Sequence, residues 1–294
     1  LMMALAFMED YPETCSDLLW HTIRSLEYTF KNLYPDGSWA ESTNYWTIVA
    51  RAMAYTYTCL NEVYDTDFKL SAFPGTEETG PANLALRSMV ASYNYHDCGE
   101  ENSYANYPMS FLGQYFNQPE LLAARRATVT QSYDSRMKKI TADVFDALFY
   151  ELSVTEEAIQ AMPRLYTTRG LEMFSVHENY TDYDGLFVAA QGGPVSFYHS
   201  HNDNGDFVFD LNGVRWAYSL PAEDYNSALP ASQRYRMRTE GHNTITINNG
   251  SGLNQLGNTY TPLIASEEGG EGAFGVYDLS SSYADADKFL RGFY

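Results

Sequence analysis

The apolar residues in the first half of the chain follow a helical period. Two stripes recur at alternating spacings of three and four residues, which places each stripe on one face of a helix. The stripes are Leu19, Ile23, Leu26, Phe30 and Leu33, then Trp46, Ala50, Met53, Tyr57 and Leu60. Ser38 and Glu41 have the spacing of a capping box, which predicts the start of the second helix. Further helices are expected near residues 81–94, 104–116, 119–128, 135–152 and 155–161. Helical hairpins joined by short loops indicate a bundle or a toroid of paired helices.

Near Pro163 the period of the apolar residues changes to two, which is the period of a β-strand. Residues 207–211 show this alternation, and the Asn212-Gly213 pair after them predicts a hairpin turn into a return strand at 214–218. A further strand is expected over residues 244–247. The order of the elements therefore predicts an α+β, multidomain chain, with a helical domain at 1–162 and an antiparallel β-sandwich at 163–294.

The composition of the chain limits the kinds of binding partner that we expect. The formal net charge of −20 argues against nucleic acid and against anionic membrane surfaces. No apolar run approaches the ~20 residues of a membrane span. The three cysteines are odd in number and far apart, so neither a disulfide scaffold nor a cysteine metal site is indicated. No secretory signal is visible, and the first residues, LMMALAFMED, have the pattern of the middle of an amphipathic helix. We therefore expect a piece of a longer chain, whose compartment and oligomeric state the sequence leaves open.

Two of the six histidines stand in the segment His199-Ser200-His201-Asn202-Asp203. In a strand, residues at i, i+2 and i+4 share a face, so His199, His201 and Asp203 could converge. Two histidines and a carboxylate suit zinc or another divalent ion, and a neutral histidine is also a competent base. The alternative is a polar turn with solvated histidines. His242, at the start of the strand expected over 244–247, is a further candidate ligand or a surface histidine.

Glu41 and Tyr45 are four residues apart, which puts them on one face at the start of the second helix. A helix N-terminus favours negative charge, so this position would help a tyrosinate form. The alternative is a helix start with a capping box and aromatic packing.

Four segments, in this order, resemble the motifs of the heparinase II/III-like family: residues 36–46, 192–207, 213–217 and 236–244. The resemblance implies an (α/α) toroid followed by a β-sandwich, with the active site between them. It implies that Tyr45 is the general acid, and also a candidate base, and that His199 belongs to the base and acid pair. It further implies that His201 and His242 are ligands of a zinc ion that orders the site rather than performing the chemistry.

The chain departs from the family pattern at two positions. Ser219 stands where the family has an aspartate as third zinc ligand, and Ser42 stands where the family has a glycine after Glu41. Zinc is therefore expected to be weakly held, absent, or completed by Asp203 or Asp224. The asparagine or histidine with which the family neutralises the substrate carboxylate is expected upstream of the first residue.

The leading hypothesis is a polysaccharide lyase that cleaves an acidic, uronate-containing polysaccharide or oligosaccharide by β-elimination. A glycosaminoglycan such as heparin or heparan sulfate comes first as substrate and an alginate-type uronan second. We assign substrate contact to Trp46, Tyr225 and Arg238, the last because arginines at 234, 236 and 238 alternate along an expected strand. That strand could equally be a solvated, charged edge strand. Two alternatives stay open, namely a degenerate relative that only binds carbohydrate and a cupin-like metal enzyme.

Overall fold

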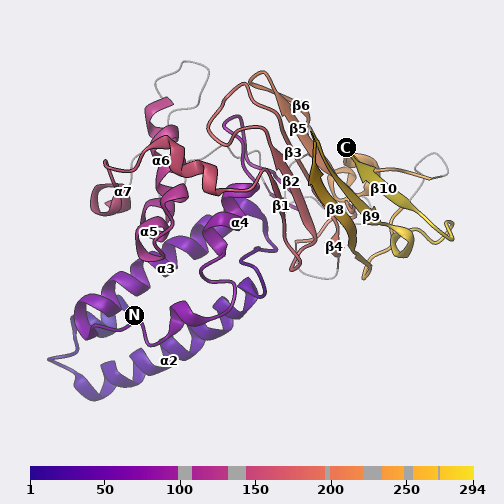
Figure 1. Cartoon of the computed structure of the whole chain (residues 1–294). Coiled ribbons are helices and arrows are strands. Elements are labelled where there is room, and N and C mark those ends of the chain that lie inside the picture. Colours follow the sequence, from indigo (N-terminus) through magenta and orange to yellow (C-terminus); the bar gives the residue numbers. More distant parts are fainter. Residues whose placement is uncertain (99–107, 132–143, 196–198, 221–233, 248–253, 271) are drawn as a thin grey trace.

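A computed structural model describes residues 1–98, 108–131, 144–195, 199–220, 234–247, 254–270 and 272–294. Figure 1 shows a helical part, formed by the first half of the chain, beside a β part formed by the second half. The α-helices are α1 (Met2–Ala6), α2 (Pro12–Phe30), α3 (Ser42–Tyr64), α4 (Thr79–Ala85), α5 (Pro108–Tyr115), α6 (Pro119–Gln131) and α7 (Val144–Phe149). Short 3-10 helices are η1 (Lys31–Leu33), η2 (Leu70–Ala72) and η3 (Glu156–Ala161). No helix in this described part combines the length and hydrophobicity that a membrane span requires.

The two predicted apolar stripes form the centre of the helical core. Every residue of the second stripe, on α3, has no exposed surface. The first stripe, on α2 and η1, packs against it, and the rings of Phe30 and Tyr57 meet edge to face with centroids 5.8 Å apart. The capping box is wrong: α3 begins at Ser42, and the Ser38 hydroxyl donates to Asp36 at 2.8 Å instead of capping the helix.

The helix expected at 81–94 ends early, at Ala85. Residues 86–98 then form an irregular segment, which contains one isolated antiparallel bridge between Arg87 and Ser92. This segment is almost completely buried because it lies between the helical part and the β part. It therefore connects the two halves of the molecule and, as shown below, supplies residues to the site.

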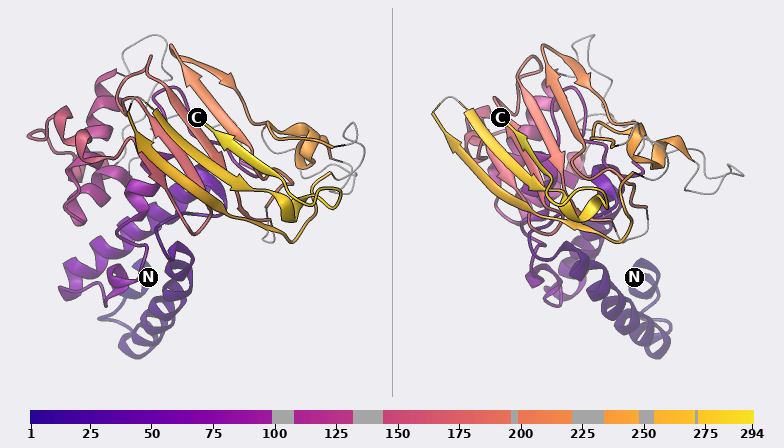
Figure 2. Two further views of the ribbon diagram at one scale, coloured as in Figure 1. Left: turned by 45° about the vertical axis from the view of Figure 1, so that its right-hand side comes forward. Right: turned by 90° about the vertical axis from the view of Figure 1, so that its right-hand side faces the viewer.

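The β part contains antiparallel sheets, which confirms the predicted α+β class. One sheet has five strands in the order β1-β2-β3-β5-β6, and a second has three in the order β10-β9-β8. The strands are β1 (Leu165–Thr167), β2 (Met173–His177), β3 (Phe187–Gln191), β5 (Phe207–Leu211), β6 (Val214–Ala217), β8 (Leu263–Gly269), β9 (Gly272–Asp278) and β10 (Leu290–Phe293). A small pair joins β4 (Gly193–Pro194) to β7 (Tyr260–Thr261). Figure 2 shows the two larger sheets stacked face to face.

The five-stranded sheet is covered on both faces. One face packs its apolar side chains, such as Phe174, against Leu263 and Tyr277 of the three-stranded sheet. The other face packs Phe187 and Val208 against the segment 86–98. Side chains along β5 therefore point alternately to the two faces of the sheet, because a strand has a period of two. One face packs against the helical part and the other against the second sheet.

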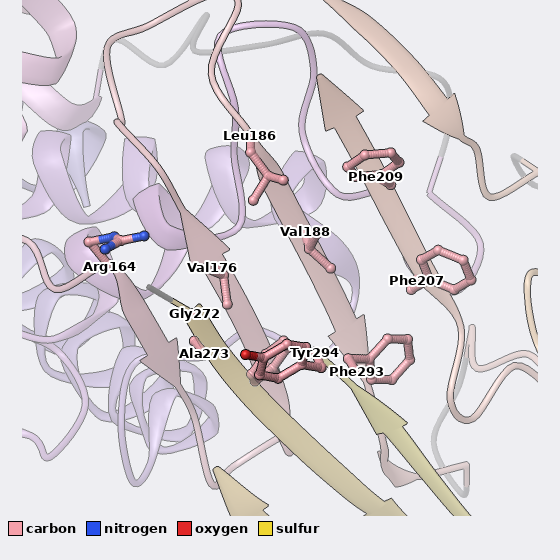
Figure 3. A pocket seen from close by; sticks show the side chains of 11 residues that line it. Arg164, Val176, Leu186, Val188, Phe207, Phe209, Gly272, Ala273, Phe293 and Tyr294 are labelled. Atoms are coloured by element: carbon pink, nitrogen blue, oxygen red, sulfur yellow. The ribbon is translucent and has the colours of Figure 1, made fainter. Parts of the chain in front are cut away.

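An apolar cavity of about 520 Å³ lies between the two sheets (Figure 3). Phe207 and Phe209, which lie on the face of β5 toward the second sheet, line it together with Val188 of β3 and with Ala273 and Phe293 of the second sheet. None of the candidate catalytic or metal-binding residues borders this cavity. It is therefore a feature of the sandwich core and not of the site.

The predicted hairpin at Asn212-Gly213 is confirmed, since both residues have positive φ (53° and 70°) between β5 and β6. Two strand predictions are wrong. Residues 244–247 form no strand. Residues 234–241 fold into the 3-10 turns η5 (Tyr235–Met237) and η6 (Thr239–Gly241), so the arginines at 234, 236 and 238 do not share the face of a strand.

Candidate active site and metal centre

The loop between β4 and β5, residues 199–206, carries most of the candidate chemistry. It is a buried turn rather than the expected strand: the Asp206 amide donates to the Asp203 carbonyl, and the Gly205 amide donates to the Gln191 carbonyl on β3. His199 has a φ of 72°, a left-handed conformation that is uncommon outside glycine. As a result His199 and His201 point to different places, and the prediction that they converge with Asp203 on one face is wrong for His199.

His199 meets residues from the helical part. Its Nδ1 contacts a carboxylate oxygen of Asp97, and its Nε2 lies 3.7 Å from an oxygen of Glu41. The imidazole stacks beside the ring of Tyr45, with centroids 6.2 Å apart and planes 28° apart. The structure thus brings together the two residues to which the resemblance assigns acid and base, one from the first turn of α3 and one from the β part.

Tyr45 is shifted toward the neutral phenol. Its pKa is raised by partial burial and, further, by the nearby carboxylates of Asp97 and Glu41 and by Cys98. The expectation that the helix N-terminus favours a tyrosinate is therefore wrong, because burial and then the acidic neighbours raise the pKa of Tyr45. A phenol that keeps its proton at neutral pH suits a general acid better than a general base.

A second cluster lies deeper and consists of His201, Asp203 and His242, all buried. One ligand atom of each lies within 4.8 Å of the others. Both ring nitrogens of His201 and Nε2 of His242 have no hydrogen-bond partner among the described residues. A buried polar atom without a partner costs about 1–3 kcal/mol. One nitrogen of each histidine and one oxygen of Asp203 can face a single bound cation, and this donor set of two imidazoles and one carboxylate suits zinc.

The protonation states in this cluster also fit a metal. Burial lowers the pKa of His201 to about 3, so the imidazole is neutral and its lone pair is available. Burial alone would raise the pKa of Asp203, but His96, His242 and His201 outweigh it and hold the pKa well below its usual range. A metal ion requires this combination of neutral histidine and ionised carboxylate.

Ser219 lies beside the cluster and is fully buried. Its hydroxyl is 3.4 Å from Nδ1 of His242, which leaves Nε2 of that histidine for the cluster. Its carbonyl accepts a hydrogen bond of 2.8 Å from the Asn94 side chain. The carboxylate of the cluster comes instead from Asp203, two residues after His201. Asp224, the other expected substitute, lies outside the described residues.

Residues of the segment 86–98 hold the cluster from the other side. The His96 amide donates to Asp203 at 3.2 Å, and its Nδ1 is 3.3 Å from the second carboxylate oxygen. Asp97, the next residue, contacts His199. Sequence reasoning missed both His96 and Asp97, because they lie 107 and 102 positions before the residues that they contact. A signal was present, since the polar run Asn94-Tyr95-His96-Asp97-Cys98 contains one of only six histidines.

The proposed substrate contacts fare differently. Trp46 has no exposed surface and its indole donates to the Thr79 hydroxyl at 2.8 Å, so it packs in the core and is not available to stack on a sugar. The Arg238 guanidinium is half-buried and pairs with Glu240 at 2.7 Å. Tyr225 lies outside the described residues.

Comparison with known proteins adds to this geometry. A sequence profile described as heparinase II/III-like, C-terminal, matches residues 174–270, which contain three of the four motifs. The β part therefore resembles the C-terminal domain of heparinase II/III-like proteins. A search of curated proteins gave no match.

Solved structures of heparinases share the fold. A mutant of the heparan sulfate lyase HepC from Pedobacter heparinus superposes with a TM-score of 0.71 at 16% identity, over 98% of this chain and 41% of that one. The unmutated HepC from Pedobacter heparinus gives 0.64 at 15% identity, over 98% and 41% of the two chains. A structure titled heparinase III gives 0.66 at 14% identity, over 98% and 43%. The heparinase-like chain thus spans about two fifths of the length of these structures.

Proposed function

We propose that this heparinase-like chain carries the acid and the base of a polysaccharide lyase that cleaves uronate-containing chains by β-elimination. The observation that carries the proposal is the pairing of Tyr45 with His199, two residues 154 positions apart by their numbers, at the junction of the helical and β parts. The match of residues 174–270 to the heparinase II/III-like C-terminal profile supports the general activity. The same proposal includes the domain organisation. Residues 1–162 would form a portion of an (α/α) toroid, and the domain boundary would lie near residue 163.

The reaction assigns each group a role. His199 removes the proton from C5 of the uronate, and Tyr45 protonates the glycosidic oxygen as it departs. The raised pKa of Tyr45 keeps that proton available at neutral pH. No water attacks the sugar, so the paired catalytic carboxylates of a glycoside hydrolase are not needed.

The anion that develops next to C5 must be stabilised for this reaction to proceed. Glu41 and Asp97 are themselves acidic and lie beside His199, so they cannot neutralise a uronate carboxylate. A further donor or cation is therefore required, and we retain Arg238 and Tyr225 as proposed substrate contacts. Among acidic substrates, a glycosaminoglycan such as heparin or heparan sulfate is proposed first and an alginate-type uronan second.

We further propose that His201, His242 and Asp203 hold a zinc ion. When bound, zinc would tie the loop at 199–206 to the turn after η6 and so fix the backbone from which His199 projects. Because all three side chains are buried, the ion would order the site rather than contact the substrate.

The test is an activity assay on a panel of heparan sulfate, heparin and alginate that follows the ultraviolet absorbance of the new double bond. Tyr45→Phe and His199→Ala should each lower kcat/KM by about 10²–10⁴-fold, the usual contribution of a positioned acid or base. The matched control is Tyr64→Phe, an exposed tyrosine on the same helix α3, which should retain wild-type activity.

Three outcomes would count against the proposal. Tyr45→Phe with wild-type rates would remove Tyr45 from the reaction. A wild-type chain that binds a uronate polymer but yields no unsaturated product at any metal concentration would instead favour a carbohydrate-binding relative without lyase activity. Oxygen-dependent turnover with bound iron would favour the cupin-like alternative.

A further inference from the structure

Asp97 occupies a fixed position beneath the proposed active site. Each of the three residues before it makes a hydrogen bond to another part of the chain. The Asn94 side chain donates to the Ser219 carbonyl, and the Tyr95 hydroxyl donates to the Trp39 carbonyl at 2.5 Å. The His96 amide donates to Asp203. The Asp97 side chain is only 3% exposed. It therefore cannot swing into solvent, and its contact with His199 is set by the surrounding backbone.

The contact fixes which ring nitrogen of His199 carries the proton. An ionised carboxylate can only accept hydrogen bonds, so Nδ1 of His199 must be the donor toward Asp97. In a neutral imidazole the other nitrogen, Nε2, is then an unprotonated acceptor. This nitrogen is directed toward the side of the ring where Glu41 lies, 3.7 Å away and beyond hydrogen-bond length.

We infer that Asp97 is a positioning residue, which holds His199 in the tautomer that presents Nε2 as the base. The inference rests on the proposed function and deepens it. Without Asp97 the imidazole would divide between its two tautomers and could turn about its side-chain bonds. Catalytic triads use the same logic, in which a buried aspartate orients a histidine without taking its proton.

Glu41 is the natural contrast, since it is the other carboxylate beside His199. Its side chain is 37% exposed, against 3% for Asp97, and it approaches the opposite nitrogen. A solvated carboxylate at that distance neither orders the ring nor fixes its tautomer. Of these two carboxylates, we therefore assign the positioning role to Asp97 and not to Glu41.

The tautomer can be measured directly by long-range ¹H–¹⁵N correlation spectra of the 294-residue chain labelled at histidine, in mildly alkaline buffer. His199→Gln identifies the His199 signals by their disappearance. We expect the Nδ1–H tautomer in the wild type and a shift toward the Nε2–H tautomer in Asp97→Asn, because the amide can donate to Nδ1. The matched control, Asp65→Asn at the exposed C-cap of α3, should leave the His199 signals unchanged.

Kinetics supply the second measurement. Asp97→Asn should lower kcat by about 10²–10⁴-fold, the range known for a mis-set tautomer or a lost general base, with KM changed less than about twofold. Asp97→Glu should recover part of the loss. Unchanged signals of His21 and of the buried His177, which lie away from the site, in Asp97→Asn show that the variant is folded.

The outcomes separate the two claims. An Nε2–H tautomer in the wild type, or an Asp97→Asn spectrum identical to it, would overturn the positioning role. A wild-type chain with the Nδ1–H tautomer and no product from any uronate polymer would overturn the proposed lyase activity but support the contact between Asp97 and His199.

Discussion

The pair formed by Asp210 and Arg215 offers the most direct test of how the β part is attached to the helical part. Asp210 is fully buried on β5 and accepts hydrogen bonds from Arg215 at 2.6 and 2.8 Å and from the Ser88 hydroxyl at 2.5 Å. Arg215, on β6, also donates to the carbonyls of Ser92 and Ala91 at 2.6 and 3.1 Å. The arginine of the third family motif thus joins the β5–β6 hairpin to the segment 86–98.

Asp210→Ala should lower the free energy of unfolding by about 3–5 kcal/mol, because removing one partner leaves a buried charge uncompensated. The three hydrogen bonds to this carboxylate give a similar figure at the lower end of their range, since each bond to a charged group is worth at least about 1.5 kcal/mol. We commit to about 4 kcal/mol, which corresponds to roughly a thousandfold change in the folding equilibrium constant. The assay is equilibrium unfolding in urea followed by circular dichroism.

The control is the removal of both charges. Asp210→Leu combined with Arg215→Met should be more stable than Asp210→Leu alone, because replacing a buried pair by apolar residues of similar volume is often neutral. The reasoning is refuted if Asp210→Ala costs less than about 1 kcal/mol, the value of an exposed ion pair. It is equally refuted if the double replacement is as unstable as the single one.

Three further predictions follow from the backbone and the metal cluster. Ser42→Gly should raise the free energy of unfolding by about 1 kcal/mol, because Ser42 has a φ of 82° that glycine adopts freely, and urea unfolding would show no gain if the strain is absent. Gly213→Ala should lower it by about 1–3 kcal/mol, since its φ is 70° and a Cβ would lie 2.3 Å from the Tyr183 ring. Asp203→Asn should abolish stoichiometric zinc measured by elemental analysis, whereas retention of zinc in this variant would exclude the Asp203 carboxylate as a ligand.

The parts of the fold that sequence reasoning predicted well are those set by local periodicity. The stripe from Trp46 to Leu60 packs inward along its whole length because a 3.6-residue period leaves one face of α3 apolar. The Asn212-Gly213 turn forms because these residues adopt positive φ at little cost. In both cases the residues that decide the structure lie within a few positions of each other.

The strand expected at 244–247 failed because tertiary contacts outweighed local preference. The run Thr-Ile-Thr-Ile has a high β propensity, but its polar groups bond to the loops around the site. The Thr244 hydroxyl donates to the Asn204 carbonyl at 2.7 Å, and the Ile247 amide donates to the Asn254 side chain at 2.6 Å. The segment supports the buried turn at 199–206 instead of joining a sheet.

In the site, too, local sequence patterns predicted some features and tertiary structure decided the others. The spacing of His199 and His201 identified both as candidates, but the positive φ at His199 sends the two rings apart, and no pattern of residue types encodes that turn. Asp97 lies 102 residues before His199, so only the fold brings them together. Sequence could name the histidines and could not name the carboxylates that orient them.

The contacts of Ser219 change what its presence means. Read from the motif alone, a serine in place of a carboxylate ligand indicates a lost metal site and hence a degenerate relative. In the structure the cluster still has a carboxylate, because Asp203 is ionised, buried and close to both histidines. The serine hydroxyl meets Nδ1 of His242, which is the position of an outer-shell partner, and such partners typically contribute 10–100-fold in metal affinity, about 1.4–2.8 kcal/mol. Ser219→Ala should therefore weaken zinc binding by that factor without abolishing it, whereas Asp203→Asn should abolish it, and equal losses in the two variants would return Ser219 to the role of a direct ligand.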